Sequence, residues 1–111
     1  MRTLKFSYEV PEIVSGAEDG ARLYWRVLSD HWLVIRPLRA GLSYKPGLED
    51  GHITHHVDLR FHSNIAVGGR FRRGSRLLII QALEDRDARH RRLICLCLEN
   101  SPTLSGFEAR T

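Results

Sequence analysis

The sequence predicts an all-β protein, a small single-domain β-barrel or sandwich with one long irregular loop. Three observations predict it. Short apolar runs are separated by turn residues, no apolar stripe of 3.6-residue period is as long as a normal helix, and 111 residues leave room for one compact core. Several short strands with evenly spaced turns are typical of barrels and sandwiches.

Five or six strands are expected, and the first two lie before residue 37. The first covers residues 5–14, where Pro11 favours an edge position or a break. Apolar and polar side chains alternate over residues 22–27, which indicates a half-buried strand. A kink then leads into the apolar run 31–36. The two runs form either a hairpin or one bent strand, and the sequence alone leaves both open.

The later strands are shorter and more apolar. A strand is expected over residues 53–61, a short one around Phe71, and two more at 77–83 and 92–98, with a tight turn at Gly74-Ser75. The barrel domain is expected to span residues 1–98, and residues 99–111 to form a loose tail. The side chains predicted to be mostly buried are Trp25, Trp32, Val57, Leu59, Ile80 and Leu96.

The long loop is predicted at residues 39–51, where RAGLSYKPGLEDG has no sustained period. Thirteen residues is long for a connection in a compact domain, and such loops are often functional. The alternative is a surface loop with no task. The candidate contact residues in it are Arg39, Leu42, Ser43, Tyr44, Lys45 and Pro46.

The composition is basic and rich in arginine. Seventeen Lys and Arg stand against 13 Asp and Glu, a net charge of +4, and fifteen of the seventeen are Arg. Arginine pairs in a bidentate way with carboxylate or phosphate, so protein interfaces and nucleic acid are both candidate partners. The alternative is a solvated arginine-rich surface.

No apolar run is long enough for a membrane helix, and the polar start lacks a signal core, so we expect no membrane contact and synthesis in the cytoplasm. Cys95 and Cys97 lie two residues apart, and on a strand they share a face without the geometry to bridge. Buried thiols are therefore expected rather than a disulfide or half of a zinc site.

Four of the six histidines fall in HITHHVDLRFH, residues 52–62. On a strand the neighbours His55 and His56 point to opposite faces, and His52 and His56 are roughly 13 Å apart, too far to bind one zinc ion. We expect His52, His56 and His62 at the surface, and His55 partly buried and hydrogen-bonded. Neither a metal or other cofactor nor catalysis is predicted, because no second ligand cluster, phosphate loop or nucleophile elbow occurs in the sequence.

The order of these landmarks resembles the head-tail joining family of tailed phages, also called head-tail adaptors, head-completion or stopper proteins. The resemblance runs through WLVIRPL at residues 32–38, THHVDLRF at 54–61, GRFRRGSRLLIIQALEDRD at 69–87 and LICLCLE at 93–99. It spans about three quarters of the chain. Gene transfer agents, which are phage-derived particles, use similar proteins.

The resemblance implies a virion protein of a phage or gene transfer agent neck, with no catalysis and no cofactor. Six or twelve copies would form a ring between the portal or adaptor and the tail or its terminator protein. The ring would close the DNA channel, dock the tail, or both, with the loop 39–51 facing DNA in the lumen. Stopper, adaptor and tail-terminating roles all remain open.

The main alternative is a small β-barrel that binds nucleic acid, suggested by arginines around Phe71. Core packing is the simpler interpretation of Phe71 itself. In a ring, the same arginines would make charged contacts between subunits or with partner proteins. These candidate arginines are Arg60, Arg70, Arg72, Arg73 and Arg76.

Overall fold

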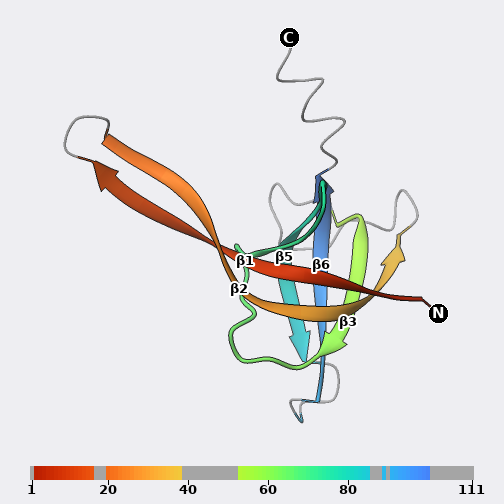
Figure 1. Cartoon of the computed structure of the whole chain (residues 1–111). Helices are drawn as coiled ribbons and strands as arrows, with labels where there is room; N and C mark the ends of the chain where they lie inside the picture. Colours follow the sequence, from red (N-terminus) through yellow and green to blue (C-terminus); the bar gives the residue numbers. More distant parts are fainter. Residues whose placement is uncertain (1, 17–19, 39–52, 86–88, 90, 101–111) are drawn as a thin grey trace.

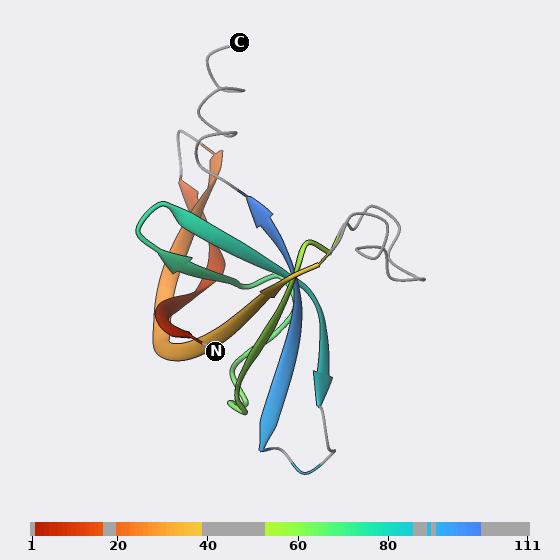
Figure 2. The same ribbon diagram turned by 90° about the vertical axis from the view of Figure 1, so that its right-hand side faces the viewer.

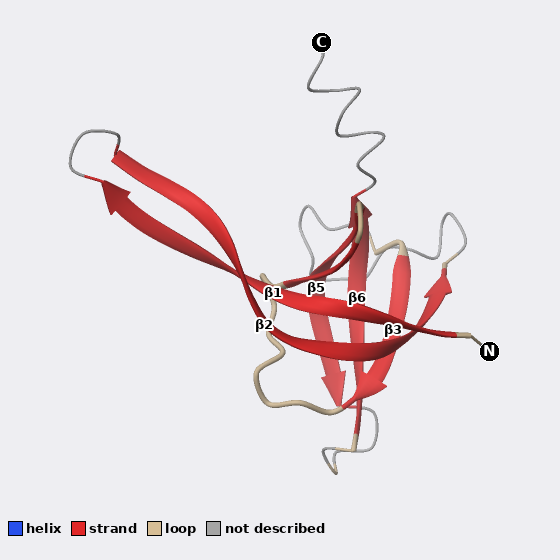
Figure 3. Cartoon of the chain, in the orientation of Figure 1, coloured by secondary structure: helices blue, strands red, loops and turns tan. Residues whose placement is uncertain are grey.

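The structure is a computed structural model that describes residues 2–16, 20–38, 53–85, 89 and 91–100. Every regular element in these ranges is a strand (Figure 3). The strands are β1 (Thr3–Gly16), β2 (Gly20–Pro37), β3 (His55–Arg60), β4 (Arg70–Arg73), β5 (Arg76–Asp85) and β6 (Arg92–Asn100). They close into an antiparallel barrel in the order β1-β2-β3-β6-β5-β4. The predicted all-β fold is confirmed, and of the two predicted architectures it is the barrel.

Two sequence signals at turns and edges are confirmed. Gly74 has φ of 60°, a left-handed conformation that glycine adopts without strain, and it turns β4 into β5. Pro11 lies beyond the last β1 residue that pairs with β4, Glu9, so its missing N–H breaks no pairing on that side.

The two predicted runs at 22–27 and 31–36 form one strand, β2. Tyr8 faces Ser29 while the next β1 residue, Glu9, faces Val27, so Leu28 is an extra residue on β2. Such a bulge bends a strand without ending it. At the other end of the chain, β6 continues to Asn100, two residues past the predicted domain boundary. Residues 101–111 and the loop 39–51 lie outside the described residues.

The core fills the barrel with side chains from all six strands. Four predicted core residues, Val57, Leu59, Ile80 and Leu96, are buried. The sequence prediction did not include several of the largest buried side chains, which are Phe6, Tyr8, Leu33 and Leu78. β3 lies beside β6 along its whole length (Figure 2) and beside β2 over His55–Asp58. Its side chains Val57 and Leu59 belong to the buried core.

The prediction for Trp32 is wrong, because its side chain is 62% exposed. Neighbouring residues of a strand point to opposite faces, and Leu33 takes the inward position at this point of β2. Trp25 is only half-buried, on the part of β2 that lies beyond the barrel.

Two of the strands are longer than the barrel needs. β1 meets β4 only at Ser7–Glu9, and β2 meets β3 only at Val34–Pro37. Residues 10–16 of β1 and 20–27 of β2 have paired partners only in the β1–β2 hairpin. This two-stranded ribbon, here called the arm, projects from the barrel in Figure 1.

Candidate interaction surfaces

All of the candidate contact residues in the loop 39–51, from Arg39 to Pro46, lie outside the described residues, so their contact role stays a prediction. The five candidate arginines of the strands are described. They fall into four places: beside Glu9, beside Glu99, at a cavity next to Trp32, and at a second cavity next to Phe6.

Arg70 and Arg72 bind the same buried carboxylate. Glu9 is 3% exposed, and its two oxygens accept from the Nε of Arg70 at 2.7 Å and the Nε of Arg72 at 3.0 Å. β4 lies beside β1 in a register that pairs Glu9 with Arg70. Trp25 lies below the Arg70 guanidinium, 3.9 Å from carbon to ring centroid. A buried charge needs such partners, so these two arginines help to hold the barrel together within one chain.

Phe71, between them, is fully buried. Its ring packs 5.7 Å from the ring of Tyr8. A base-stacking platform needs an exposed aromatic face, so the surface predicted for the nucleic-acid alternative does not form here.

Arg76 belongs to a second intramolecular group. Its Nε and Nη2 donate to Glu99 at 2.9 and 3.0 Å, a bidentate pair. His55 Nε2 lies 3.3 Å from Glu99 and its Nδ1 lies 2.8 Å from Thr54 Oγ1. Burial lowers the pKa of His55, while Glu99 raises it and Arg76 lowers it. The prediction that His55 is partly buried and hydrogen-bonded is confirmed.

Arg60 lies with Trp32 at a cavity of about 310 Å³ on the outside of the barrel. Arg92, also in the cavity wall, donates to Asp58 at 2.7 and 2.9 Å. The residues lining the cavity are Thr3, Asp30, His31, Trp32, Arg60 and Arg92. An exposed indole beside two guanidinium groups is suited to a partner that brings apolar side chains and carboxylates.

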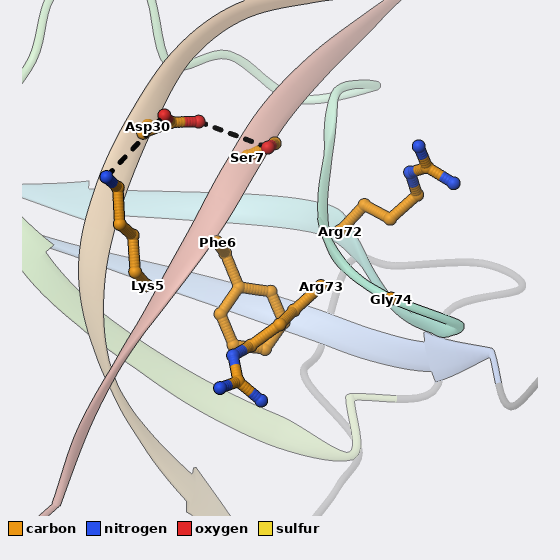
Figure 4. A pocket seen from close by; sticks show the side chains of 7 residues that line it. All are labelled: Lys5, Phe6, Ser7, Asp30, Arg72, Arg73 and Gly74. Atoms are coloured by element: carbon orange, nitrogen blue, oxygen red, sulfur yellow. Dashed lines mark hydrogen bonds and ion pairs between the residues drawn. The ribbon is translucent and has the colours of Figure 1, made fainter.

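Arg73 lines another cavity, of about 330 Å³, over β1 and β4 (Figure 4). Phe6 lies at its floor, and Asp30 bridges Lys5 and Ser7 along one wall. Arg72 points away from the Phe6 ring in this view. The charges of the wall are thus partly matched within the chain.

The other histidines of HITHHVDLRFH depart from the surface prediction. His56 and His62 are half-buried, and the His62 ring packs edge-on against His31 with centroids 5.1 Å apart. Burial lowers the pKa of His31, and His62 lowers it further against a smaller opposite effect of Asp30. His52 lies outside the described residues.

The prediction of buried thiols is confirmed for Cys95 and Cys97, both free and fully buried on β6. Burial raises the pKa of Cys95 to about 12 and raises that of Cys97 further. Within the described ranges, no three His, Cys, Asp or Glu side chains gather as metal ligands would. Those ranges also contain no helix able to cross a membrane.

The arm is the surface that the sequence prediction missed. Six of the eight exposed large apolar side chains of the described residues lie on or beside it. They are Ile13, Val14, Leu23, Tyr24, Val27 and Leu28. The structure reveals it through strand length, because β1 and β2 have 14 and 18 residues, whereas strands of globular proteins usually have about 5–6.

A solved structure shares this fold. A chain of the virion of a native gene transfer agent (GTA) particle superimposes with a TM-score of 0.63 at 20% identity, covering 91% of this chain and 96% of that chain. No protein-family model matches the sequence. No curated protein matches it significantly either. The likeness therefore extends over most of both chains.

Proposed function

We propose that this chain is a structural subunit of a phage or phage-like particle, specifically a head-tail connector. The observation that carries the proposal is the likeness, over nearly the full length of both chains, to a chain of a gene transfer agent virion. The resemblance of THHVDLRF and its neighbouring segments to head-tail joining proteins points the same way and was reached independently of the fold.

In this proposal six or twelve copies form a ring between the portal or adaptor and the tail. The ring closes the DNA channel, docks the tail, or both. The loop 39–51 faces DNA in the lumen, and Arg60 and Arg73, which are exposed, contact neighbouring subunits or partner proteins. The other three candidate arginines already bind Glu9 or Glu99 in their own chain, so their main task is the barrel. Such a role needs no catalysis.

Deleting the gene in the bacterium that makes the particle tests the proposal. We expect DNA-filled heads without tails, together with free tails, in electron micrographs, and normal particles when the wild-type gene is supplied on a plasmid. Tailed particles that transfer DNA normally after the deletion would overturn the connector role.

A second experiment addresses the loop. Replacing residues 42–47 with a Gly/Ser linker should leave the barrel folded, because the six strands that the structure describes all lie outside this segment. We expect the resulting particles to leak DNA or fail to join tails. Normal DNA transfer by these particles would remove the loop from the proposed mechanism.

A further inference from the structure

The arm presents two different faces. In an antiparallel pair, residues opposite each other share a face, and positions two apart share it as well. One face carries the pairs Ser15–Ala21, Ile13–Leu23, Pro11–Trp25 and Glu9–Val27. Along the arm this face, here called the apolar arm face, has no charged side chain beyond Glu9, which is buried under Arg70 and Arg72 at the base.

The opposite face is mixed. It carries the pairs Val14–Arg22, Glu12–Tyr24 and Val10–Arg26, and the Arg26 guanidinium lies 2.9 Å from the Glu12 carboxylate. Polar groups on one side and a continuous apolar stripe on the other are the pattern of a ribbon that lies on a surface.

Among the described residues, Arg70 covers Trp25 on the apolar arm face, but the apolar side chains on either side of Trp25 stay open. Ile13, Leu23 and Val27 are 71%, 57% and 53% exposed. A two-stranded ribbon is marginally stable by itself in water, and contiguous exposed apolar side chains mark interaction sites. Apart from Trp25, the apolar arm face is therefore an unpartnered surface of the isolated chain.

A complementary surface occurs on the same molecule, at the cavity beside Trp32. Outside the arm and its base, Trp32 and Val67 are the exposed large apolar side chains of the described residues, and Trp32 is the one that lines a cavity. Arg60 adds a positive charge to the wall, whereas Arg92 there is paired with Asp58 and Asp30 lies near Lys5. In the sequence, two of the three residues between Gly16 and Gly20 are acidic, Glu18 and Asp19.

We propose that the apolar arm face of one copy docks beside Trp32 of a second copy, head to tail. The arm cannot reach this cavity in its own chain, because both lie on the same continuous strand pair, β1 and β2, and the arm extends away from the barrel (Figure 1). Each copy thus offers one arm and one cavity, and a contact between unlike surfaces repeats from copy to copy. Closure of this chain of contacts into a ring rests on the proposed function.

A single contact of this kind is small, so we expect weak association of the isolated protein. The exposed large apolar side chains of this face are Ile13, Leu23 and Val27, whereas a standard stable interface takes roughly 20–30 residues from each partner. Sedimentation velocity should show a monomer at a few micromolar and growing oligomers at several hundred micromolar. A wild-type protein that stays monomeric at 1 mM would overturn the proposal.

Paired double variants test which face of the arm is used. Ile13→Ser with Leu23→Ser removes the apolar arm face, and Val14→Ser with Tyr24→Ser removes similar side chains from the opposite face. We expect the first pair to weaken association at least tenfold and the second less than threefold. Equal weakening by both would overturn the choice of face, and circular dichroism checks that each variant stays folded.

Trp25 and Trp32 are the two tryptophans of the sequence, which makes the cavity observable by fluorescence. In Trp25→Phe, emission comes from Trp32 alone and should shift to shorter wavelength as the concentration rises. Emission that stays constant while oligomers form would overturn the role of the cavity. Arg60→Glu should weaken association, whereas Arg73→Glu, outside the cavity, should not.

Mixing experiments separate head-to-tail docking from pairing of two arms. The Ile13→Ser, Leu23→Ser variant keeps its cavity and Trp32→Ala keeps its arm, so each should be monomeric alone and their mixture should form a heterodimer that does not grow. Self-association of Trp32→Ala at the wild-type strength would indicate arm-to-arm pairing and overturn the proposal. These measurements use the purified chain, so their failure leaves the gene-deletion test of the connector role unaffected.

Discussion

β1 and β2 each run through two environments, the barrel and the arm. Apolar residues alternate along the strand in both, but they are buried in the barrel and exposed in the arm. In the barrel, Phe6, Tyr8 and Leu33 are fully buried, and the residues just before them, Lys5, Ser7 and Trp32, are half-buried or exposed. In the arm, Ile13 and Leu23 alternate in the same way and are exposed. The difference is the third strand: β4 covers β1 only as far as Glu9, and β3 covers β2 only from Val34. Alternation therefore predicts which face is apolar, and the neighbouring strands decide whether that face is covered.

The largest expected contrast is between two leucines of these regions. Leu59→Ala should lower the free energy of unfolding by about 2–5 kcal/mol, because Leu59 is fully buried and its truncation leaves a cavity. Leu23→Ala, on the arm, should change it by less than about 0.5 kcal/mol. Urea unfolding of both variants measures this. A Leu23→Ala cost close to that of Leu59→Ala would mean that the arm packs on its own barrel in solution.

What the sequence could predict follows from the same contrast. Val57 and Leu59 were predicted correctly because β3 is short, apolar on one face and paired with a strand on each side. Trp32 was predicted wrongly because the faces of β2 depend on the bulge at Leu28. After this bulge Leu33 points into the core, so its neighbour Trp32 points to solvent. A one-residue change of register reverses the two faces, and no local pattern reports it.

The candidate surfaces were harder to predict because they depend on distant pairings. The burial of Glu9 requires β1 beside β4, which brings it to Arg70 and Arg72 more than 60 residues along the chain. The sequence identified these arginines as candidate contacts but not their intramolecular carboxylate. The pairing of β1 with β4 depends on how the whole barrel closes, whereas the arginines of β4 can be read directly from the sequence. The arginines could therefore be predicted as contacts, but their partner Glu9 could not.

The buried and exposed ion pairs give the next contrast. Glu9→Gln should cost about 1.5–3 kcal/mol, because it removes charge-assisted hydrogen bonds from a buried site and leaves two arginines without their carboxylate. Glu12→Gln, which removes the exposed pair with Arg26 on the arm, should cost about 0–1 kcal/mol. Both are measured by urea unfolding at low and high salt. Equal costs would show that the Glu9 site is hydrated in solution.

Acid should act on the barrel through its half-buried histidines. Burial lowers the pKa of His31 and His55 in the folded chain, so below the unfolded value of about 6.5 the unfolded chain binds protons more readily. The free energy of unfolding should be nearly constant between pH 7 and pH 8 and fall from pH 6.5 toward pH 5.5. His31→Gln with His55→Gln should flatten this fall, and Leu23→Ala on the arm should not. A wild-type profile that rises toward pH 5.5 would contradict the direction of both shifts.

Thiol reactivity gives the finest comparison, because it detects opening of the barrel without unfolding it. Thiolate is the reactive form, and burial both hides Cys95 and Cys97 and raises their pKa values, that of Cys95 to about 12. At pH 8 neither should react with a disulfide reagent over an hour, while both react at once in urea. Leu23→Cys places a third thiol on the exposed apolar arm face, and we expect that thiol alone to react in the folded protein. If Cys95 or Cys97 reacted at a rate similar to that of the introduced cysteine, the barrel core would be open to the reagent in the folded protein. The barrel and the arm would then differ little in how accessible their side chains are in solution.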